Sequence, residues 1–177
     1  MIIDWLLSKA KRNYIVIIVL GYFLFPLYLL PMIIDEGDLK PLDLLLYYDA
    51  DILYQMLAAY GERIRSRYFI GLLSVDLIYP FYYSLLMALV IAAIIKAIPL
   101  PRQDLRFLVL LPFVVLATDL IENLLLVSLL THYPNKMVFM ANIAGVMTFT
   151  KWLMFAGVLV VILYLLGVLF WQKRQRL

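Results

Sequence analysis

The fold class is decided by the stretch from Met137 to Trp171, MVFMANIAGVMTFTKWLMFAGVLVVILYLLGVLFW, which has 35 residues and one charged side chain, Lys151. A helix needs about 20 apolar residues to cross the hydrocarbon core of a bilayer. Because backbone groups in lipid must bond to one another, we expect this stretch to form a membrane-spanning helix. It is longer than a straight crossing requires, so we expect it to begin outside the hydrocarbon or to bend near Gly145.

Three further stretches are long and apolar enough to cross a membrane, residues 14–34, 68–95 and 105–130. The composition agrees, with 66% hydrophobic and 15% charged residues. The first stretch lacks a small-residue cleavage site after a short apolar core, so we expect it to be retained. We therefore predict an all-α integral membrane protein with one domain over residues 1–177 and four transmembrane helices in an antiparallel bundle. The fourth helix is expected over residues 137–171.

An extra helix is expected between the first two spans, over about residues 50–65. Apolar residues recur there at helical spacing: Ile52, Leu53, Met56, Leu57, Tyr60 and Ile64. Asp49 or Asp51 can cap its start. An amphipathic helix lying on the membrane surface is the favoured interpretation, and a plain linker is the alternative.

The distribution of charge predicts the orientation. Nine basic residues fall on one side of the predicted bundle: Lys9, Lys11, Arg12, Lys96, Arg102, Arg106, Lys173, Arg174 and Arg176. Five basic residues fall on the other side, together with seven acids. Because basic flanks favour the cytoplasm, we expect both termini there. The net charge of +3 comes mostly from these flanks and gives no indication of nucleic-acid binding.

Several kinds of chemistry are excluded by composition. The chain has no cysteine, which excludes thiol nucleophiles, disulfide exchange and iron–sulfur ligation. The single His132 excludes paired-histidine haem ligation. Oxygen ligands for a hard cation are present, but Lys151 competes for them. We therefore predict no metal and no cofactor.

Four charged residues lie inside the predicted spans, away from the basic flanks: Asp76, Asp119, Glu122 and Lys151. An isolated charge at such a position costs roughly 3 kcal/mol or more, so each needs a partner or a function. A rise of about 1.5 Å per residue places all four roughly 18 to 30 Å from the cytoplasmic boundary. They therefore share the outer half of the bundle, as residues of one site would.

Spacing along each helix supports one polar site, because residues three and four apart share a face. Three groups result: Asp76, Tyr79 and Tyr83; Asp119, Glu122 and Asn123; Thr148 and Lys151, with Trp152 beside them. Burial disfavours a charged carboxyl group, and a neighbouring carboxylate adds to this, so one of Asp119 and Glu122 can act as a general acid. We predict Asp76, Asp119 and Glu122 as catalytic or charge-recognition groups. The predicted ligand-binding residues are Tyr79, Tyr83, Asn123, Thr148, Lys151 and Trp152.

This constellation favours a pocket for a hydrophobic or amphiphilic ligand, such as a lipid, an isoprenoid or a sterol-like molecule. It also suits acid/base isomerisation, although the sequence leaves open whether the protein is an enzyme. A purely structural network paired through Lys151 is one alternative. A second is proton or cation translocation, which the apolar run from Leu85 to Ile95 disfavours. A third is an accessory subunit or homodimer docking through small residues: Ala141, Ala144, Gly145, Ala156 and Gly157.

A family resemblance is carried by five motifs: Tyr60-Gly61-Glu62, Asp76-x-x-Tyr79-Pro80-x-x-Tyr83, Asp119-x-x-Glu122-Asn123, Tyr133-Pro134 and Phe149-Thr150-Lys151-Trp152. In combination they make the chain, from about Tyr48 to Trp152, resemble an uncharacterised bacterial family of small four-helix membrane proteins. The resemblance implies a bacterial inner-membrane location and carries no activity.

A looser similarity of layout exists to the EXPERA proteins, which include sterol isomerases and sigma-2-type sterol-binding receptors. The shared features are four helices, an extra segment between the first two, acids in the third helix, and Asp76 followed by Pro80 in the second. This resemblance implies a cavity among the helices that takes sterols or cationic amphiphiles. Lys151 departs from an acid-dominated pocket and leaves the charge of the ligand open.

Overall fold

The computed structural model describes residues 1–29, 41–98 and 103–175, and every regular element within them is helical. In chain order these are α1 (Ile2–Lys9), α2 (Arg12–Leu24), the π-helix η1 (Phe25–Leu29), the 3₁₀ helix η2 (Leu42–Leu44), α4 (Ala50–Leu73), α5 (Val75–Ala97), the 3₁₀ helix η3 (Gln103–Leu110), α6 (Leu111–His132) and α7 (Val138–Arg174). The predicted all-α class is confirmed for this part of the chain.

Three helical segments are long and apolar enough to cross a membrane, Val75–Ala97, Asp104–His132 and Val138–Arg174. This confirms the prediction of membrane-spanning helices for the described chain from Val75 onward. The apolar helix α2 is shorter, with 13 residues, and is followed by η1. Residues 30–34 of the predicted first span lie outside the described residues.

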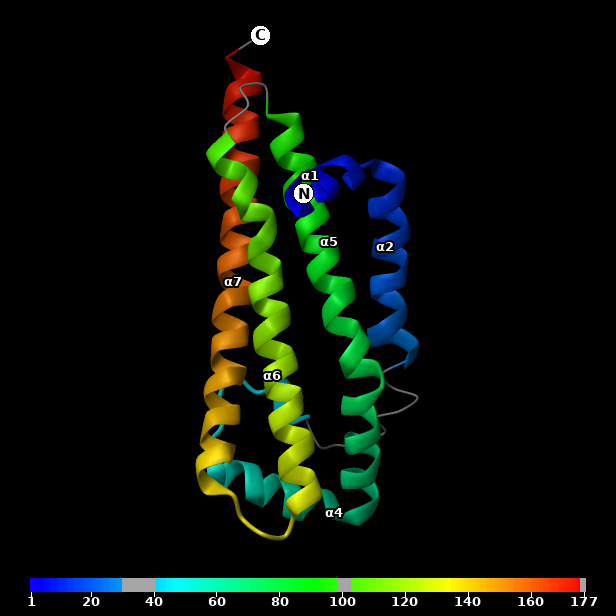
Figure 1. Cartoon of the computed structure of the whole chain (residues 1–177), viewed down its shortest axis with the longest axis vertical. Helices are drawn as coiled ribbons and strands as arrows, with labels where there is room; N and C mark the ends of the chain where they lie inside the picture. The colour runs from blue at the N-terminus through cyan, green and yellow to red at the C-terminus, as the bar shows by residue number, and fades with distance from the viewer. Residues whose placement is uncertain (30–40, 99–102, 176–177) are drawn as a thin grey trace.

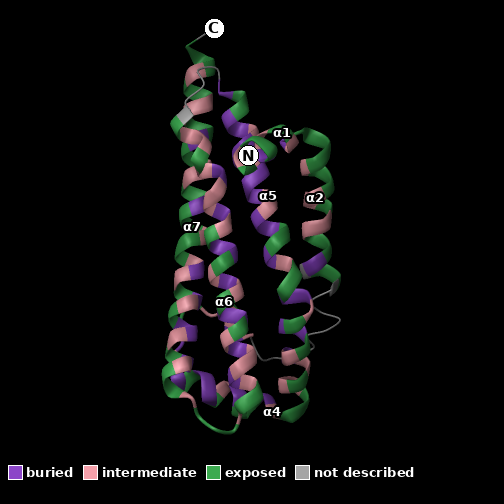
Figure 2. Cartoon of the chain, viewed as in Figure 1, coloured by how far each residue is buried: buried purple, intermediate pink, exposed green. Residues whose placement is uncertain are grey.

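The long helices run side by side along one axis (Figure 1). Helix α5 packs against α2 on one side and α6 on the other, and α6 packs along α7. Helix α1 and the last turns of α7 lie at the same end of the bundle (Figure 1). Much of the outward surface of α7 is exposed apolar side chain (Figure 2), as expected of a surface that faces lipid.

Helix α4 differs from the expected helix over residues 50–65, because it continues to Leu73 through a kink at Gly61. Gly61 has φ 65°, which a residue without a Cβ adopts without strain. The part before Gly61 lies across the end of the bundle away from both termini (Figure 1). Leu53, Leu57 and Tyr60 on this part are buried against the ends of the long helices.

The expected second span over residues 68–95 is divided in the structure. Helix α4 ends at Leu73 and α5 begins at Val75, with Ser74 in a non-helical conformation between them. The Ser74 hydroxyl donates a hydrogen bond to the carbonyl of Ile70 at 2.6 Å. In a continuous helix this carbonyl would instead accept from the backbone N–H of Ser74. Hydropathy alone does not reveal this break.

Residues 41–49 lie against the bundle with two side chains inserted into it, while Leu44, Leu46 and Tyr47 stay exposed. Leu42 and Tyr48 are both fully buried. Tyr48 crosses α7 at Gly145, where a Cβ would lie 1.7 Å from the Tyr48 carbonyl oxygen. Helix α7 is continuous through this point, so Gly145 provides a close approach of two backbones and not the expected bend.

Candidate functional site

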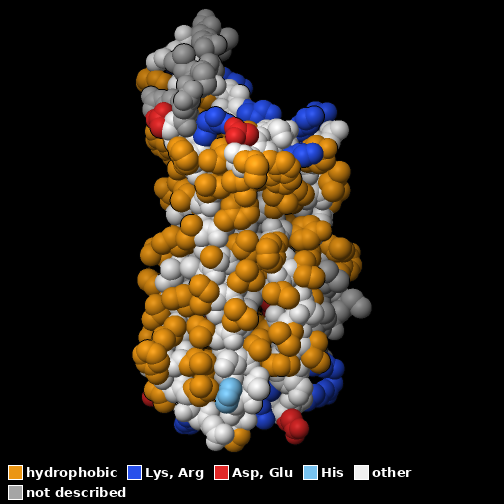
Figure 3. Space-filling view, viewed as in Figure 1, with side chains coloured by type: hydrophobic (Ala, Val, Ile, Leu, Met, Phe, Trp, Pro, Cys, Tyr) orange, Lys and Arg blue, Asp and Glu red, His pale blue; other side chains and the backbone are white. Residues whose placement is uncertain are grey.

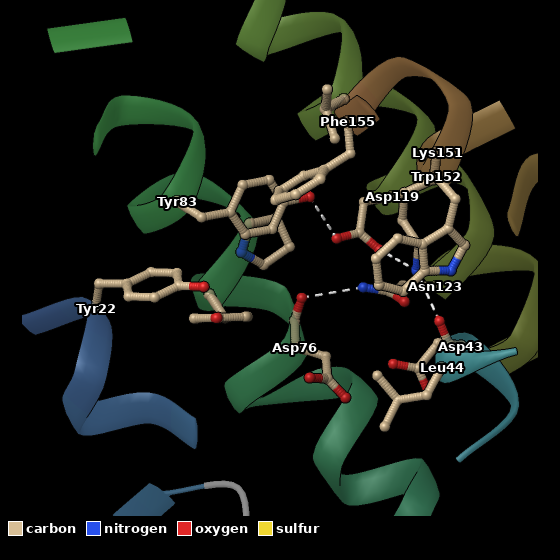
Figure 4. Close-up of a pocket in the computed structure, with 13 residues that line it drawn as sticks. Tyr22, Asp43, Leu44, Asp76, Tyr83, Asp119, Asn123, Lys151, Trp152 and Phe155 are labelled. Atoms are coloured by element: carbon tan, nitrogen blue, oxygen red, sulfur yellow. Dashed lines mark hydrogen bonds and ion pairs between the residues drawn. The ribbon is translucent and has the colours of Figure 1, made fainter. Parts of the chain in front are cut away.

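A cavity of about 200 Å³ lies among the helices, and Figure 4 shows the side chains that line it. It is lined by Tyr22 of α2; Asp43 and Leu44; Asp76, Tyr79, Pro80 and Tyr83 of α5; Val115, Asp119 and Asn123 of α6; and Lys151, Trp152 and Phe155 of α7. Its wall therefore combines three carboxylates, one ammonium group and an apolar rim.

The Lys151 ammonium group joins three parts of the chain. Its Nζ lies 2.7 Å from Glu122 Oε2 and 3.2 Å from Asp119 Oδ1, and it donates to the backbone carbonyl of Asp43 at 3.3 Å. Lys151 therefore donates hydrogen bonds to Asp43 and Asp119 and forms an ion pair with Glu122. Lys151 is thus the centre of a network between α6, α7 and residues 41–49.

The two acids of α6 occupy different positions around Lys151. Asp119 faces the cavity, and its Oδ2 accepts a hydrogen bond from the Tyr83 hydroxyl at 2.7 Å (Figure 4). Glu122 is fully buried behind the lysine, where its Oε1 accepts a hydrogen bond from Thr148 at 2.5 Å. Asp119 can therefore contact a ligand, whereas Glu122 fixes the position of the ammonium group.

Asp76 and Asn123 meet because of Pro80. A proline has no N–H, so the carbonyl four residues before it loses its partner within the helix. The carbonyl of Asp76 is in this position in α5, and it accepts a hydrogen bond from Asn123 Nδ2 at 3.0 Å. Pro80 therefore frees a carbonyl in α5, and Asn123 of α6 donates a hydrogen bond to it, which joins the two helices.

We expect Asn123→Leu to lower the free energy of unfolding by about 1–3 kcal/mol, because it leaves the buried Asp76 carbonyl without this donor. Pro80→Ala supplies a backbone N–H for the same carbonyl. The cost of Asn123→Leu should therefore be smaller in the Pro80→Ala background, as thermal denaturation of the four proteins in detergent would measure. Equal costs in the two backgrounds would contradict the coupling.

The segment 41–49 contributes contacts that sequence reasoning missed. Asp43 offers its carbonyl to Lys151, and its Oδ1 accepts a hydrogen bond from Tyr68 at 3.0 Å. The carbonyl of Leu45 accepts a hydrogen bond from the Trp152 indole at 2.9 Å. Burial raises the pKa of Tyr48, and the charge of Glu122 adds to this shift, so its hydroxyl stays neutral. The apolar content of residues 42–48 was the available signal that this linker packs against the bundle.

The structure brings the sequence-predicted site residues into one region of the bundle. Seven of them line the cavity: Asp76, Tyr79, Tyr83, Asp119, Asn123, Lys151 and Trp152. Glu122 and Thr148 lie behind this wall and bond to one another. Tyr22 and Phe155 also line the cavity and were not predicted. In the described part of the chain, no three His, Asp or Glu side chains are grouped as metal ligands.

Fold and site together define an all-helical protein with membrane-spanning helices and a polar cavity inside the bundle. Comparison of the chain with protein-family models, curated proteins and solved structures finds no match. The functional argument therefore depends on the geometry of the cavity.

Proposed function

We propose that the chain crosses the bacterial inner membrane four times, with α2 and η1 in the first crossing and both termini in the cytoplasm. The part of α4 before Gly61 is then the interfacial helix. Its inward side chains are apolar, and the exposed Asp51 and Gln55 lie on its other face. The basic residues near α1 and at the end of α7 support this orientation.

We further propose that the cavity binds the polar head of an amphiphilic ligand. The observation that carries this proposal is the cavity itself, because Asp76, Asp119 and Lys151 border an open volume of about 200 Å³ inside an otherwise apolar bundle. A purely structural ion pair gains from close packing and needs no such space. The site therefore has the concave form of a small-molecule pocket, with charged and polar groups set beside apolar side chains.

The size of the cavity limits what it can enclose. Pockets for whole drug-sized ligands are about 300–1,000 Å³, so about 200 Å³ suits a head group and not a complete sterol. Leu44, Val115 and Phe155 in the wall would contact the hydrocarbon next to that head group. Figure 3 shows a small area of acidic side chain among hydrophobic ones at mid-height, which supports access from the lipid side.

An acid/base reaction on this ligand is an extension of the proposal. Asp119 borders the cavity and already accepts a hydrogen bond from Tyr83 on one oxygen. In such a reaction Asp119 would move a proton to or from the ligand, as in migration of a double bond. Glu122 would act through Lys151, because it lies behind the cavity wall.

Val115→Phe tests the binding function, because Val115 is fully buried in the cavity wall. We expect the larger side chain to fill the cavity and to reduce co-purifying lipid or amphiphile at least about tenfold, as mass spectrometry after purification in mild detergent would measure. Val114→Phe is the matched control, since Val114 is 46% exposed on the outer surface of the same helix.

An empty structural cavity predicts the opposite result for this pair. Filling it would leave co-purifying molecules unchanged and would raise the melting temperature, since buried apolar volume stabilises the fold. That result would favour the structural alternative, for which the ion pairs of Lys151 with Asp119 and Glu122 are the supporting observation.

Translocation through the bundle receives less support. The buried side chains of α5 from Met87 to Ile95 are all apolar, and they belong to one apolar cluster with Val109 and Val158. A proton or cation path would need polar groups there. Docking of a partner on α7 is restricted too, because Ala141 and Ala144 are fully buried in the chain's own core.

A further inference from the structure

A second feature is a groove that begins beside α1 and extends along α5 and α6 to Phe81 and Phe113, close in sequence to residues that line the cavity. This groove of about 490 Å³ is bordered by α1, α5 and α6, and its wall contains Met1, Ile2, Trp5, Leu6, Phe81, Leu85 and Phe113. Every one of these side chains is apolar. The groove is separate from the cavity around Lys151, because the described residues that line the two sites are different.

Helix α1 presents an apolar surface outward as well as inward. Leu6 is 1% exposed and belongs to the core, which fixes the helix against α5. Ile2 and Trp5 are 56% and 50% exposed, although they lie on a short helix that crosses the end of the bundle. Tryptophan is enriched where the hydrocarbon of a membrane meets the head groups. The groove thus begins at the level where the head groups of lipids lie.

Basic residues outnumber acidic ones near α1: Lys9, Lys11 and Arg12 lie at its end and just after it, and Lys96 and Arg106 reach it by hydrogen bonds, against Asp4 and Asp104. Lys96 donates to the carbonyl of Ala10, and Arg106 pairs with Asp4. The Arg106–Asp4 pair is exposed, so it leaves the guanidinium open to a competing anion. Lys11 and Arg12 are exposed. In Figure 3, basic side chains border the apolar zone at this end.

We propose that this end of the protein binds an anionic phospholipid, with one acyl chain in the groove and the phosphate among the basic side chains around α1. The apolar wall accepts hydrocarbon, and the excess of basic groups at the head-group level complements a negative lipid. The occupant is a lipid of the surrounding leaflet, because the groove is lined by apolar side chains and needs a hydrocarbon chain to fill it. A soluble anion has no such chain.

Quenching by brominated lipids tests this proposal, because Trp5 lines the groove. A variant with Trp152→Phe and Trp171→Phe retains Trp5 as the fluorescent reporter, and is placed in vesicles that contain brominated phosphatidylglycerol or brominated phosphatidylcholine. We expect phosphatidylglycerol to bind near Trp5 roughly fivefold more tightly than phosphatidylcholine does. This preference should vanish in the variant that combines Lys11→Gln and Arg12→Gln. The control pair is Arg63→Gln and Lys136→Gln, two exposed basic residues at the other end.

Equal quenching by the two lipids, or a preference that survives Lys11→Gln and Arg12→Gln, would overturn the proposal. If the tryptophan variant does not fold, the unmodified protein gives a second test. Mass spectrometry of retained lipids should then find phosphatidylglycerol enriched on the wild type and not on the Lys11→Gln and Arg12→Gln variant. Equal enrichment on both would reject the site. Neither outcome bears on the cavity around Lys151, because the described residues that line the groove and the cavity are different.

Discussion

Lys151→Met is expected to lower the free energy of unfolding by about 3–5 kcal/mol, because it leaves Asp119 and Glu122 buried without their cation. Methionine has a similar length and adds no charge, so the change removes the ammonium group and little volume. For a chain of this size, the loss corresponds to a fall in the melting temperature of roughly 6–20 °C. Differential scanning fluorimetry in detergent would measure it.

Neutralising the acids together with the lysine provides the matched control. Replacement of a whole buried ionic cluster by neutral groups is often tolerated, whereas removal of one partner is not. The triple variant Lys151→Met, Asp119→Asn and Glu122→Gln should therefore recover at least half of the lost stability. If the single Lys151→Met variant has the same melting temperature as the wild type, that result would contradict the buried network described above.

Gly145→Ala is expected to disrupt the packing of residues 41–49 on α7. The added Cβ would lie 1.7 Å from the carbonyl oxygen of Tyr48, an atom that cannot move without shifting the segment 41–49. Overpacking of this kind costs about 1–3 kcal/mol. Alanine gains roughly 1 kcal/mol over glycine in a helix, and we expect the steric cost to exceed this gain. Hydrogen exchange of the amides in residues 42–49 should increase, since the displaced segment loses its contacts with Lys151 and Trp152.

Gly157→Ala isolates the steric effect. Gly157 lies on the same helix, and a Cβ added there would meet no atom of the described residues within 4 Å beyond its own stretch of helix. This substitution should leave hydrogen exchange unchanged and stabilise the protein by up to about 1 kcal/mol. Identical behaviour of the two alanine variants would show that residues 41–49 do not pack on α7 at Gly145.

Local patterns in the sequence were sufficient to group the polar residues. The spacing of Asp119, Glu122 and Asn123 placed them on one face of a helix, and the depth argument placed Asp76 and Lys151 beside them. The structure brings these five residues together in α5, α6 and α7. The grouping was predictable because isolated charges are costly in an apolar bundle and must find one another.

The remaining contacts depend on tertiary structure that no local pattern encodes. Backbone carbonyls of Asp43 and Leu45 complete the site, and a carbonyl is present at every residue whatever its type. Helix α1 was not expected, because eight residues are too few for a periodic pattern to stand out. The break at Ser74 lies within an apolar run, where hydropathy gives no sign of it.

The central claim is that the cavity between α5, α6 and α7 is a binding site, and an experimental density map tests it most directly. The protein should be purified in mild detergent without removal of lipid, and its structure determined by cryo-electron microscopy with a bound antibody fragment. We expect density for a ligand head group within hydrogen-bonding distance of Asp119, with its apolar part passing Phe155. A closed interior, with the side chains of Asp76 and Asp119 packed together and no space between them, would contradict the claim.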